Sequence, residues 1–244
     1  GGWVPTSYDG VREAMPWMNF LKIRASYGLV GNDRLTSTRF PYLTLMQNNS
    51  GGGGWGSTVG SITEERIGAN NLQWEKAKKA DIGIEGKFLN NKLEFTVDFF
   101  QDRRDGIYQQ RTQIPDYAGL ATMPYGNVGK MISYGSDGNI SYTHDFNKDW
   151  TWTVRGNFTY SANKVENWEQ PDQPYDYQNY SGYVHNAFRG YVSLGLFRDE
   201  VDVKQSPRQT FGEYTVGDIK YKDVNADGIV DDDDKVPLSY PNYP

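Results

Sequence analysis

Residues 81–99, DIGIEGKFLNNKLEFTVDF, carry the clearest structural pattern in the chain. Apolar side chains alternate with charged or small ones on both sides of the pair Asn90-Asn91. A period of two predicts β-strands with one apolar face, and asparagine tolerates the left-handed backbone that a tight turn requires. The stretch therefore predicts an antiparallel hairpin whose two strands share an apolar face.

The same alternation recurs on both sides of this hairpin. It runs through residues 21–29, and again through residues 140–144 and 150–160, which flank a polar turn at 145–149. The sequence therefore predicts an all-β protein built from antiparallel strands.

The connections between these strands differ greatly in length. The turns near residues 90 and 147 are short, whereas residues 31–75, 103–128 and 163–240 form long connections. Short turns at one end and long loops at the other are typical of an outer-membrane β-barrel. A soluble β-sandwich also alternates apolar and polar residues, so alternation alone leaves both architectures open.

Composition excludes several classes of protein. The chain has 244 residues and two histidines. It has no cysteine, which excludes a disulfide framework, a thiol nucleophile and a cysteine-ligated metal. A net charge of −6 argues against a nucleic-acid partner. No run approaches the ~18 apolar residues of a transmembrane helix. Aromatic residues make up 15% of the chain, which suits a barrel with aromatic rims.

Four motifs, in order along the chain, give a resemblance to a known family. They are Trp17 to Gly28 followed by Gly31-Asn32, Asn71 to Glu75 leading into Asp81 to Ile84, Asn127 to Lys130, and Gly217 to Asp223 with the acidic residues that follow. The sequence resembles the SusC/RagA family of TonB-dependent transporters over nearly its whole length. The resemblance implies an outer-membrane location in Bacteroidota and part of a 22-stranded transmembrane barrel embedded in lipid.

The resemblance also implies partners and a domain organisation. It implies energy supplied by TonB through an N-terminal plug domain, a SusD-like surface lipoprotein, and uptake of oligosaccharides or peptides. We predict that residues 1–244 belong to the barrel, with a long extracellular loop region at 163–240 and no plug domain. Gly1-Gly2-Trp3 is not a natural translation start, so we expect part of a longer protein.

The alternation also predicts which side chains face lipid and which face the lumen. The residues predicted to face lipid are Ile82, Phe88, Leu93, Phe95, Val97, Trp152 and Phe158. Those predicted to face the lumen are Glu85, Glu94, Asp98 and Arg155.

An acidic loop at residues 223–234 matches the calcium-loop pattern D-x-[DN]-x-[DN]-G with an acidic residue at position twelve. Side-chain oxygens would bind one structural Ca²⁺, Gly228 would permit the turn, and Val230 would anchor the loop in apolar packing. The predicted ligands are Asp223, Asn225, Asp227, the carbonyl of Ile229, Asp231 and Asp234. The alternative is a solvated acidic loop, because residues 218–235 contain seven Asp and three Lys.

Aromatic residues crowd the long loops, where their rings could stack on sugars or cover a partner surface. The predicted substrate- or partner-binding residues are Trp55, Trp168, Tyr175, Tyr177 and Tyr180. Packing within the loops is the alternative.

We predict a component of SusC-like nutrient import that works by binding and gated passage and is not an enzyme. A secreted glycan hydrolase, which needs two carboxylates facing one cleft, is a third class that the sequence does not show. The rival prediction is a soluble extracellular β-rich module that binds glycan and carries a structural calcium.

Overall fold

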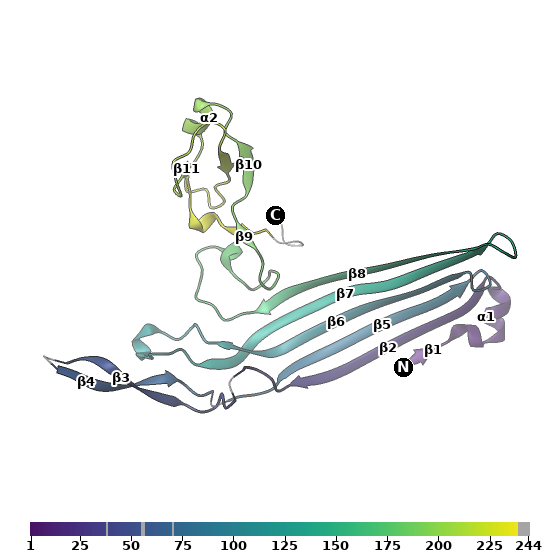
Figure 1. Ribbon diagram of the computed structural model, residues 1–244, viewed down its shortest axis with the longest axis horizontal. Coiled ribbons are helices and arrows are strands. Elements are labelled where there is room, and N and C mark those ends of the chain that lie inside the picture. The colour runs from purple at the N-terminus through teal and green to yellow at the C-terminus, as the bar shows by residue number, and fades with distance from the viewer. Residues whose placement is uncertain (38, 55–56, 70, 239–244) are drawn as a thin grey trace. The chain divides into compact units, whose positions relative to one another are not determined.

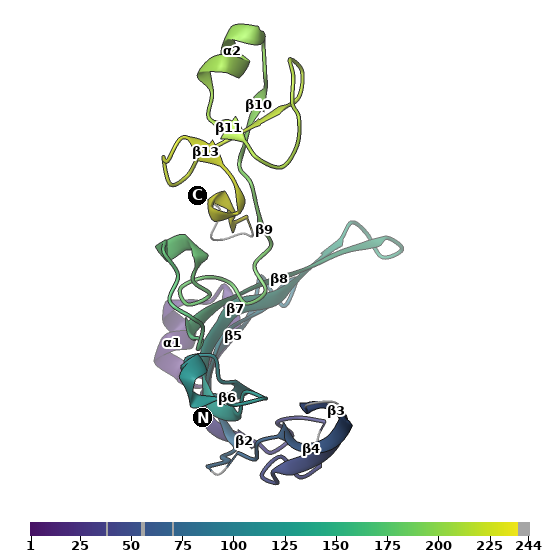
Figure 2. The same cartoon turned by 90° about the vertical axis from the view of Figure 1, so that its left-hand side faces the viewer.

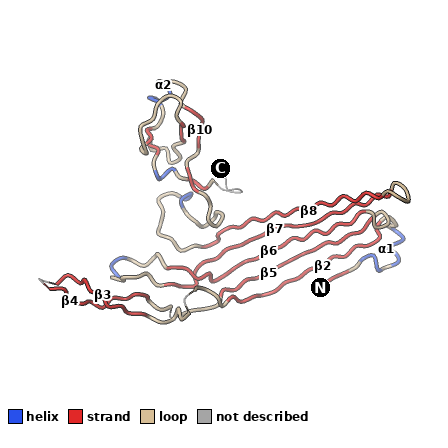
Figure 3. The backbone as a smooth tube through the Cα atoms, viewed as in Figure 1, coloured by secondary structure: helices blue, strands red, loops and turns tan. Residues whose placement is uncertain are grey.

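The computed structural model describes residues 1–37, 39–54, 57–69 and 71–238. The chain divides into two compact units, Gly1–Asn163 and Lys164–Pro244. Strands dominate the first unit, whereas loops dominate the second (Figure 3). Among the described residues, no helix is long and apolar enough to cross a membrane.

The first unit is built on one antiparallel sheet with the strand order β1-β2-β5-β6-β7-β8 (Figures 1 and 2). Its strands are β1 (Gly2–Trp3), β2 (Met18–Asn32), β5 (Glu75–Phe88), β6 (Leu93–Gln110), β7 (Tyr125–Asp145) and β8 (Thr151–Asn167). The sheet is open, with β1 and β8 at its edges. This confirms the predicted all-β class and the antiparallel pairing.

The predicted tight turn at Asn90-Asn91 is present. Leu89, Asn90 and Asn91 have φ values of 55°, 58° and 63°, which is the left-handed region that asparagine tolerates. The second predicted turn lies between the end of β7 at Asp145 and the start of β8 at Thr151. Both turns lie at the same end of the sheet, and the long connections of the first unit lie at the opposite end (Figure 1).

The long connections contain structure that the sequence did not predict. The hairpin of β3 (Leu45–Gly54) and β4 (Ser57–Arg66) is part of the chain segment that connects β2 to β5. The other short elements of the first unit are η1 (Pro5–Ser7), α1 (Asp9–Ala14) and η2 (Asp116–Ala118). Those of the second unit are η3 (Asp176–Gln178), β9 (Arg189–Gly190), β10 (Ser193–Leu196), α2 (Glu200–Gln205), β11 (Arg208–Gln209), β12 (Ile219–Tyr221), β13 (Ile229–Val230), η4 (Asp232–Asp234) and β14 (Val236–Pro237).

The two faces of the large sheet differ in chemistry, as the alternation predicts. The register aligns Ile82 with Phe99 and Ile84 with Val97, and Ile82 and Phe99 are each 52% exposed. Apolar side chains this exposed are typical of a strand face that meets an apolar environment, such as the hydrocarbon of a membrane.

The opposite face carries an ion-pair network across three strands. The guanidinium of Arg24 on β2 donates to Asp98 on β6 at 2.6 Å, and lies 3.5 Å from the carboxylate of Glu85 on β5. Lys22 also pairs with Glu85, and Lys87 pairs with Glu94. Glu85, Glu94 and Asp98 therefore share the polar face that we predicted to line the lumen.

Candidate functional site: the loop end of the sheet and the acidic loop

Two of the sequence motifs meet in space at the loop end of the sheet. The side chain of Asn127, which begins the motif Asn127 to Lys130, accepts a hydrogen bond from the backbone N–H of Gln73 at 2.9 Å. Its amide nitrogen donates to the carbonyls of Gln73 and Gly106, both at 2.8 Å. Glu75 forms a further link between strands, because its carboxylate accepts hydrogen bonds from the N–H of Tyr108 and from the side-chain amide of Asn32. The hydrogen bonds of these motifs therefore link β2, β5, β6 and β7.

Replacing Asn127 with alanine is expected to loosen this end of the sheet by about 1–2 kcal/mol, because three hydrogen bonds are lost. Faster amide hydrogen exchange at residues 72–75 in the full-length protein would report the change. Asn147→Ala is the matched control, since Asn147 accepts two backbone hydrogen bonds in the short turn at the opposite end. Unchanged exchange at residues 72–75 in Asn127→Ala would show that the contacts carry no stability.

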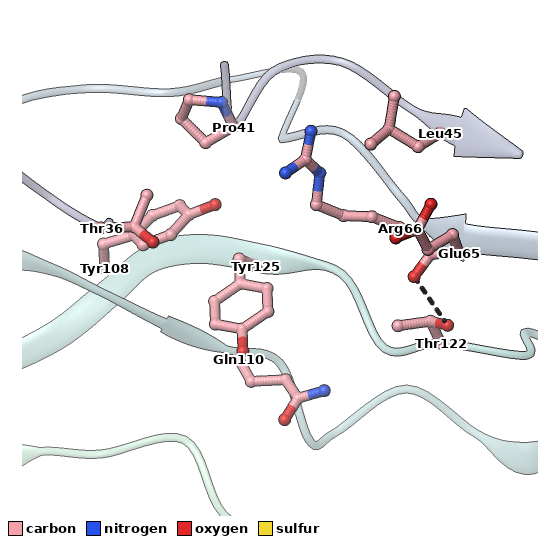
Figure 4. A pocket seen from close by; sticks show the side chains of 9 residues that line it. All are labelled: Thr36, Pro41, Leu45, Glu65, Arg66, Tyr108, Gln110, Thr122 and Tyr125. Carbon is pink, nitrogen blue, oxygen red and sulfur yellow. Dashed lines mark hydrogen bonds between the residues drawn. The ribbon is translucent and has the colours of Figure 1, made fainter. Parts of the chain in front are cut away.

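A cavity of about 320 Å³ lies beside this junction, and we name it the loop-base pocket. Figure 4 shows its nine lining residues, which come from the connection after β2, the β3–β4 hairpin, the end of β6, the β6–β7 connection and the start of β7. Among the lining residues are Arg66, Tyr108, Gln110 and Tyr125. The hydroxyl of Thr122 donates to the backbone carbonyl of Glu65 at 3.4 Å, which ties the β6–β7 connection to β4.

The polar groups of the loop-base pocket are held in place by the backbone. Arg66 donates from Nε to the carbonyl of Leu43 at 3.3 Å and from Nη2 to the carbonyl of Phe40 at 3.0 Å. The rings of Tyr108 and Tyr125 stack with centroids 5.3 Å apart and planes inclined by 20°. No sequence motif predicted this pocket, because its residues are far apart in the chain.

In the second unit, two predicted aromatic residues line one cavity. Trp168 and Tyr180 border a space of about 260 Å³ together with Val165, Val184, His185 and Asn186. The rings of Trp168 and His185 lie 5.3 Å apart, and Val165 at the base is only 1% exposed. We name this cavity the aromatic pocket. An apolar floor with an indole and a phenol on its walls is suited to a sugar ring or an apolar side chain.

Arg189 holds the wall of the aromatic pocket in place, a role that no sequence pattern predicted. Its guanidinium donates to the carbonyls of Tyr177 and Asn179 at 2.7 and 2.6 Å, and its Cζ lies 5.4 Å from the ring centroid of Tyr180. Two fixed carbonyls and a cation–π contact hold Tyr180 in place. A lone arginine among polar loop residues gives no sequence signal for such a role.

Tyr175 and Tyr177 contact the acidic loop. Their rings stack with centroids 5.4 Å apart, the hydroxyl of Tyr177 donates to the carbonyl of Asp233, and the amide of Asn225 donates to the hydroxyl of Tyr175. Burial, followed by the negative charge of Asp234, raises the pKa of Tyr177 to about 12. Their role in binding a substrate or partner stays a prediction, and Trp55 lies outside the described residues.

The acidic loop is closed on itself by hydrogen bonds to its own backbone. Asp223 accepts from the N–H groups of Ala226 and Gly228 at 2.6 and 2.8 Å, and Asp227 accepts from the N–H of Ile229 at 2.8 Å. Gly228 has a φ of 88°, which explains the glycine at this position. Val230 is fully buried, as the motif predicted.

Asp234 is the buried centre of the acidic loop. It is 0% exposed, and its carboxylate accepts from the N–H groups of Val224, Asn225 and Asp231 at 2.6, 3.3 and 2.9 Å. Asp231 in turn caps η4 by accepting from the N–H of Asp233. Over the ranges that the structure describes, no three His, Cys, Asp or Glu side chains converge as metal ligands. The oxygen-only donor set suits Ca²⁺, and the calcium site stays a prediction from the motif.

Comparison with known proteins identifies the family. The family model described as TonB dependent receptor-like, beta-barrel matches residues 7–241. The chain belongs to this family. Members of the TonB-dependent receptor β-barrel family are outer-membrane proteins, which confirms the predicted location. The match also favours the membrane barrel over the soluble module that the alternation left open.

Curated relatives support the SusC/RagA resemblance. TonB-dependent receptor SusC of Bacteroides thetaiotaomicron is 26% identical over 147 residues, which are 59% of this chain and 14% of that protein. TonB-dependent receptor P39 of Formosa agariphila is 25% identical over 264 residues, covering 94% of this chain and 25% of the relative. The chain therefore spans a quarter or less of these two relatives. Their names describe receptors and no enzymes.

Solved structures show the same fold. The structure of the RagAB peptide importer in the open-open state matches with a TM-score of 0.64 at 20% identity, covering 91% of this chain and 23% of that chain. The closed-closed state matches with a TM-score of 0.61. With the family match over residues 7–241, the open sheet of the first unit is a section of a TonB-dependent receptor barrel wall.

Proposed function

We propose that the full-length protein imports oligosaccharides across the outer membrane with energy from TonB, together with a SusD-like surface lipoprotein. Membership of the TonB-dependent receptor barrel family supports transport, and the similarity to SusC supports this class of importer. The neighbouring RagAB structures are titled as a peptide importer, so peptides are the second candidate substrate.

The observation that carries the oligosaccharide proposal is the aromatic pocket. Trp168 and Tyr180 line this cavity together with the buried Val165, and Arg189 holds Tyr180 in place. Flat aromatic faces bind the C–H faces of sugar rings with little loss of side-chain entropy, because each ring has only two rotatable bonds. The proposal keeps the predicted loop region at residues 163–240 on the extracellular side, where this pocket would be accessible to substrate.

Uptake by cells tests this proposal. A strain that lacks the gene is complemented with the wild-type protein, Trp168→Ala or Trp150→Ala, and is supplied with fluorescent oligosaccharide or peptide mixtures. Trp168→Ala is expected to reduce oligosaccharide uptake about tenfold, the size of a central aromatic contact. Trp150, 73% exposed beside the short turn, provides the matched control.

Two results would contradict the proposal. Uptake of peptides alone by the wild-type strain would assign the protein to peptide import. Equal uptake of oligosaccharides by Trp168→Ala and wild type would show that the aromatic pocket does not take part in substrate recognition.

A further inference from the structure

The loop-base pocket combines an aromatic platform with a fixed positive charge. The stacked pair Tyr108 and Tyr125 forms one wall, and Tyr125 remains 40% exposed. In Figure 4 the side chain of Arg66 extends from β4 into the space between Pro41 and the two tyrosine rings. The guanidinium of Arg66 and the partly exposed ring of Tyr125 therefore line the same cavity.

The guanidinium of Arg66 is positioned but not neutralised. Its Nε and Nη2 atoms donate to the backbone carbonyls of Leu43 and Phe40, which fix the plane of the group. These partners are uncharged, and Arg66 forms no ion pair within the part of the chain that the structure describes. Guanidinium has five donors in a planar fork, so Nη1 remains able to bind a carboxylate.

The other lining groups suit sugar hydroxyls. Gln110 presents an amide, whose nitrogen already donates to the carbonyl of Met123 at 3.5 Å, so that its oxygen remains an acceptor. Glu65 lines the pocket as well and is not paired with Arg66. A carboxylate accepts hydrogen bonds from hydroxyls but repels a second anion. Arg66 is the cationic side chain among the lining residues, and it can balance one negative charge of a ligand.

We propose that the loop-base pocket is a subsite for one uronic acid residue, a sugar ring that bears a carboxylate. The ring stacks on Tyr125, its carboxylate binds Arg66, and its hydroxyls bind Gln110 and Glu65. The volume of about 320 Å³ accommodates a single ring with its carboxylate. This inference rests on the proposed import of oligosaccharides and adds that the imported glycan is acidic.

A glycan array tests this subsite. Detergent-solubilised full-length protein is applied to an array that pairs uronate-bearing oligosaccharides with the same oligomers after reduction of their carboxyls to alcohols. The wild-type protein is expected to prefer the uronate form about tenfold, the effect of one charge-assisted hydrogen-bonded pair. Arg66→Gln is expected to abolish that preference, whereas Arg39→Gln, an exposed arginine in the same connection, is expected to retain it.

A second variant is needed because Arg66→Gln could lower binding only by disturbing the loop that Arg66 holds. Tyr125→Leu leaves Arg66 and its backbone partners in place. It is expected to weaken the binding of both glycan forms about tenfold, while the preference for uronate stays. Equal binding of the two forms by the wild-type protein, or no effect of Tyr125→Leu, would overturn the subsite alone. Binding of no oligosaccharide of either form would overturn the proposed function with it.

Discussion

Val97→Arg is expected to destabilise the full-length barrel by about 2–4 kcal/mol, the cost of an arginine on the lipid face near the middle of a bilayer. Val97 lies five residues after the short turn at residue 92 and pairs with Ile84 and Gly138. The phenyl ring of Phe158 lies over Gly138, where an added Cβ would be 2.8 Å from Cε1 of that ring. The substituted charge would therefore enter an apolar surface.

The adjacent residue provides the control. Thr96 pairs with Glu85 and shares the face of the Arg24–Asp98 network. Thr96→Arg is expected to change stability by about 0.5 kcal/mol or less, as at other water-exposed positions. Urea titration of the protein folded into lipid vesicles measures both values. Equal destabilisation by the two substitutions would contradict the assignment of one face to lipid and the other to a water-filled lumen.

The strands that the sequence predicted correctly are those whose alternation is complete. Residues 81–99 carry an apolar side chain at nearly every second position, so period and turn chemistry agree. The predicted connection at residues 103–128 was wrong at both ends, because β6 continues to Gln110 and β7 begins at Tyr125. The alternation is weak in the first half of β7 because glycine replaces side chains there. An added Cβ at Gly135 would lie 2.6 Å from the ring of Phe100, so the aromatic residue of one strand covers the glycine of the next. The hairpin β3–β4 was missed for the same reason, since the run Gly51 to Gly54 has no side chains to alternate.

The candidate sites were predictable only where one segment supplies the chemistry. The acidic loop occupies twelve consecutive residues, so its pattern is visible in the sequence. Trp168 and Tyr180 were predicted as separate aromatic residues, and the fold brings them into one pocket. Arg66 and Arg189 were missed, because their positions depend on carbonyls that only the folded loops bring near.

Asp234→Ala is expected to unfold the acidic loop, with a local loss of about 3 kcal/mol or more, because three backbone N–H groups lose their only carboxylate acceptor in a buried site. Since Asp234 is 0% exposed, water cannot replace those hydrogen bonds without opening the loop. Limited proteolysis of the full-length protein would show rapid cutting within residues 218–236, and this cutting is expected with calcium and with chelator alike.

Asp227→Ala tests the calcium prediction without disturbing the backbone hydrogen bonds of Asp234. Asp227 is exposed and accepts only local hydrogen bonds, so its loss is expected to leave the loop closed but remove one cation ligand. If the motif binds Ca²⁺, a concentration ~100 times the dissociation constant stabilises the wild-type loop by about 2.7 kcal/mol. Chelator should then speed cutting of the wild-type loop and have no effect on Asp227→Ala. Identical cutting of the wild-type loop with and without chelator would show that hydrogen bonds to the backbone, without a cation, hold seven aspartates together in residues 218–235.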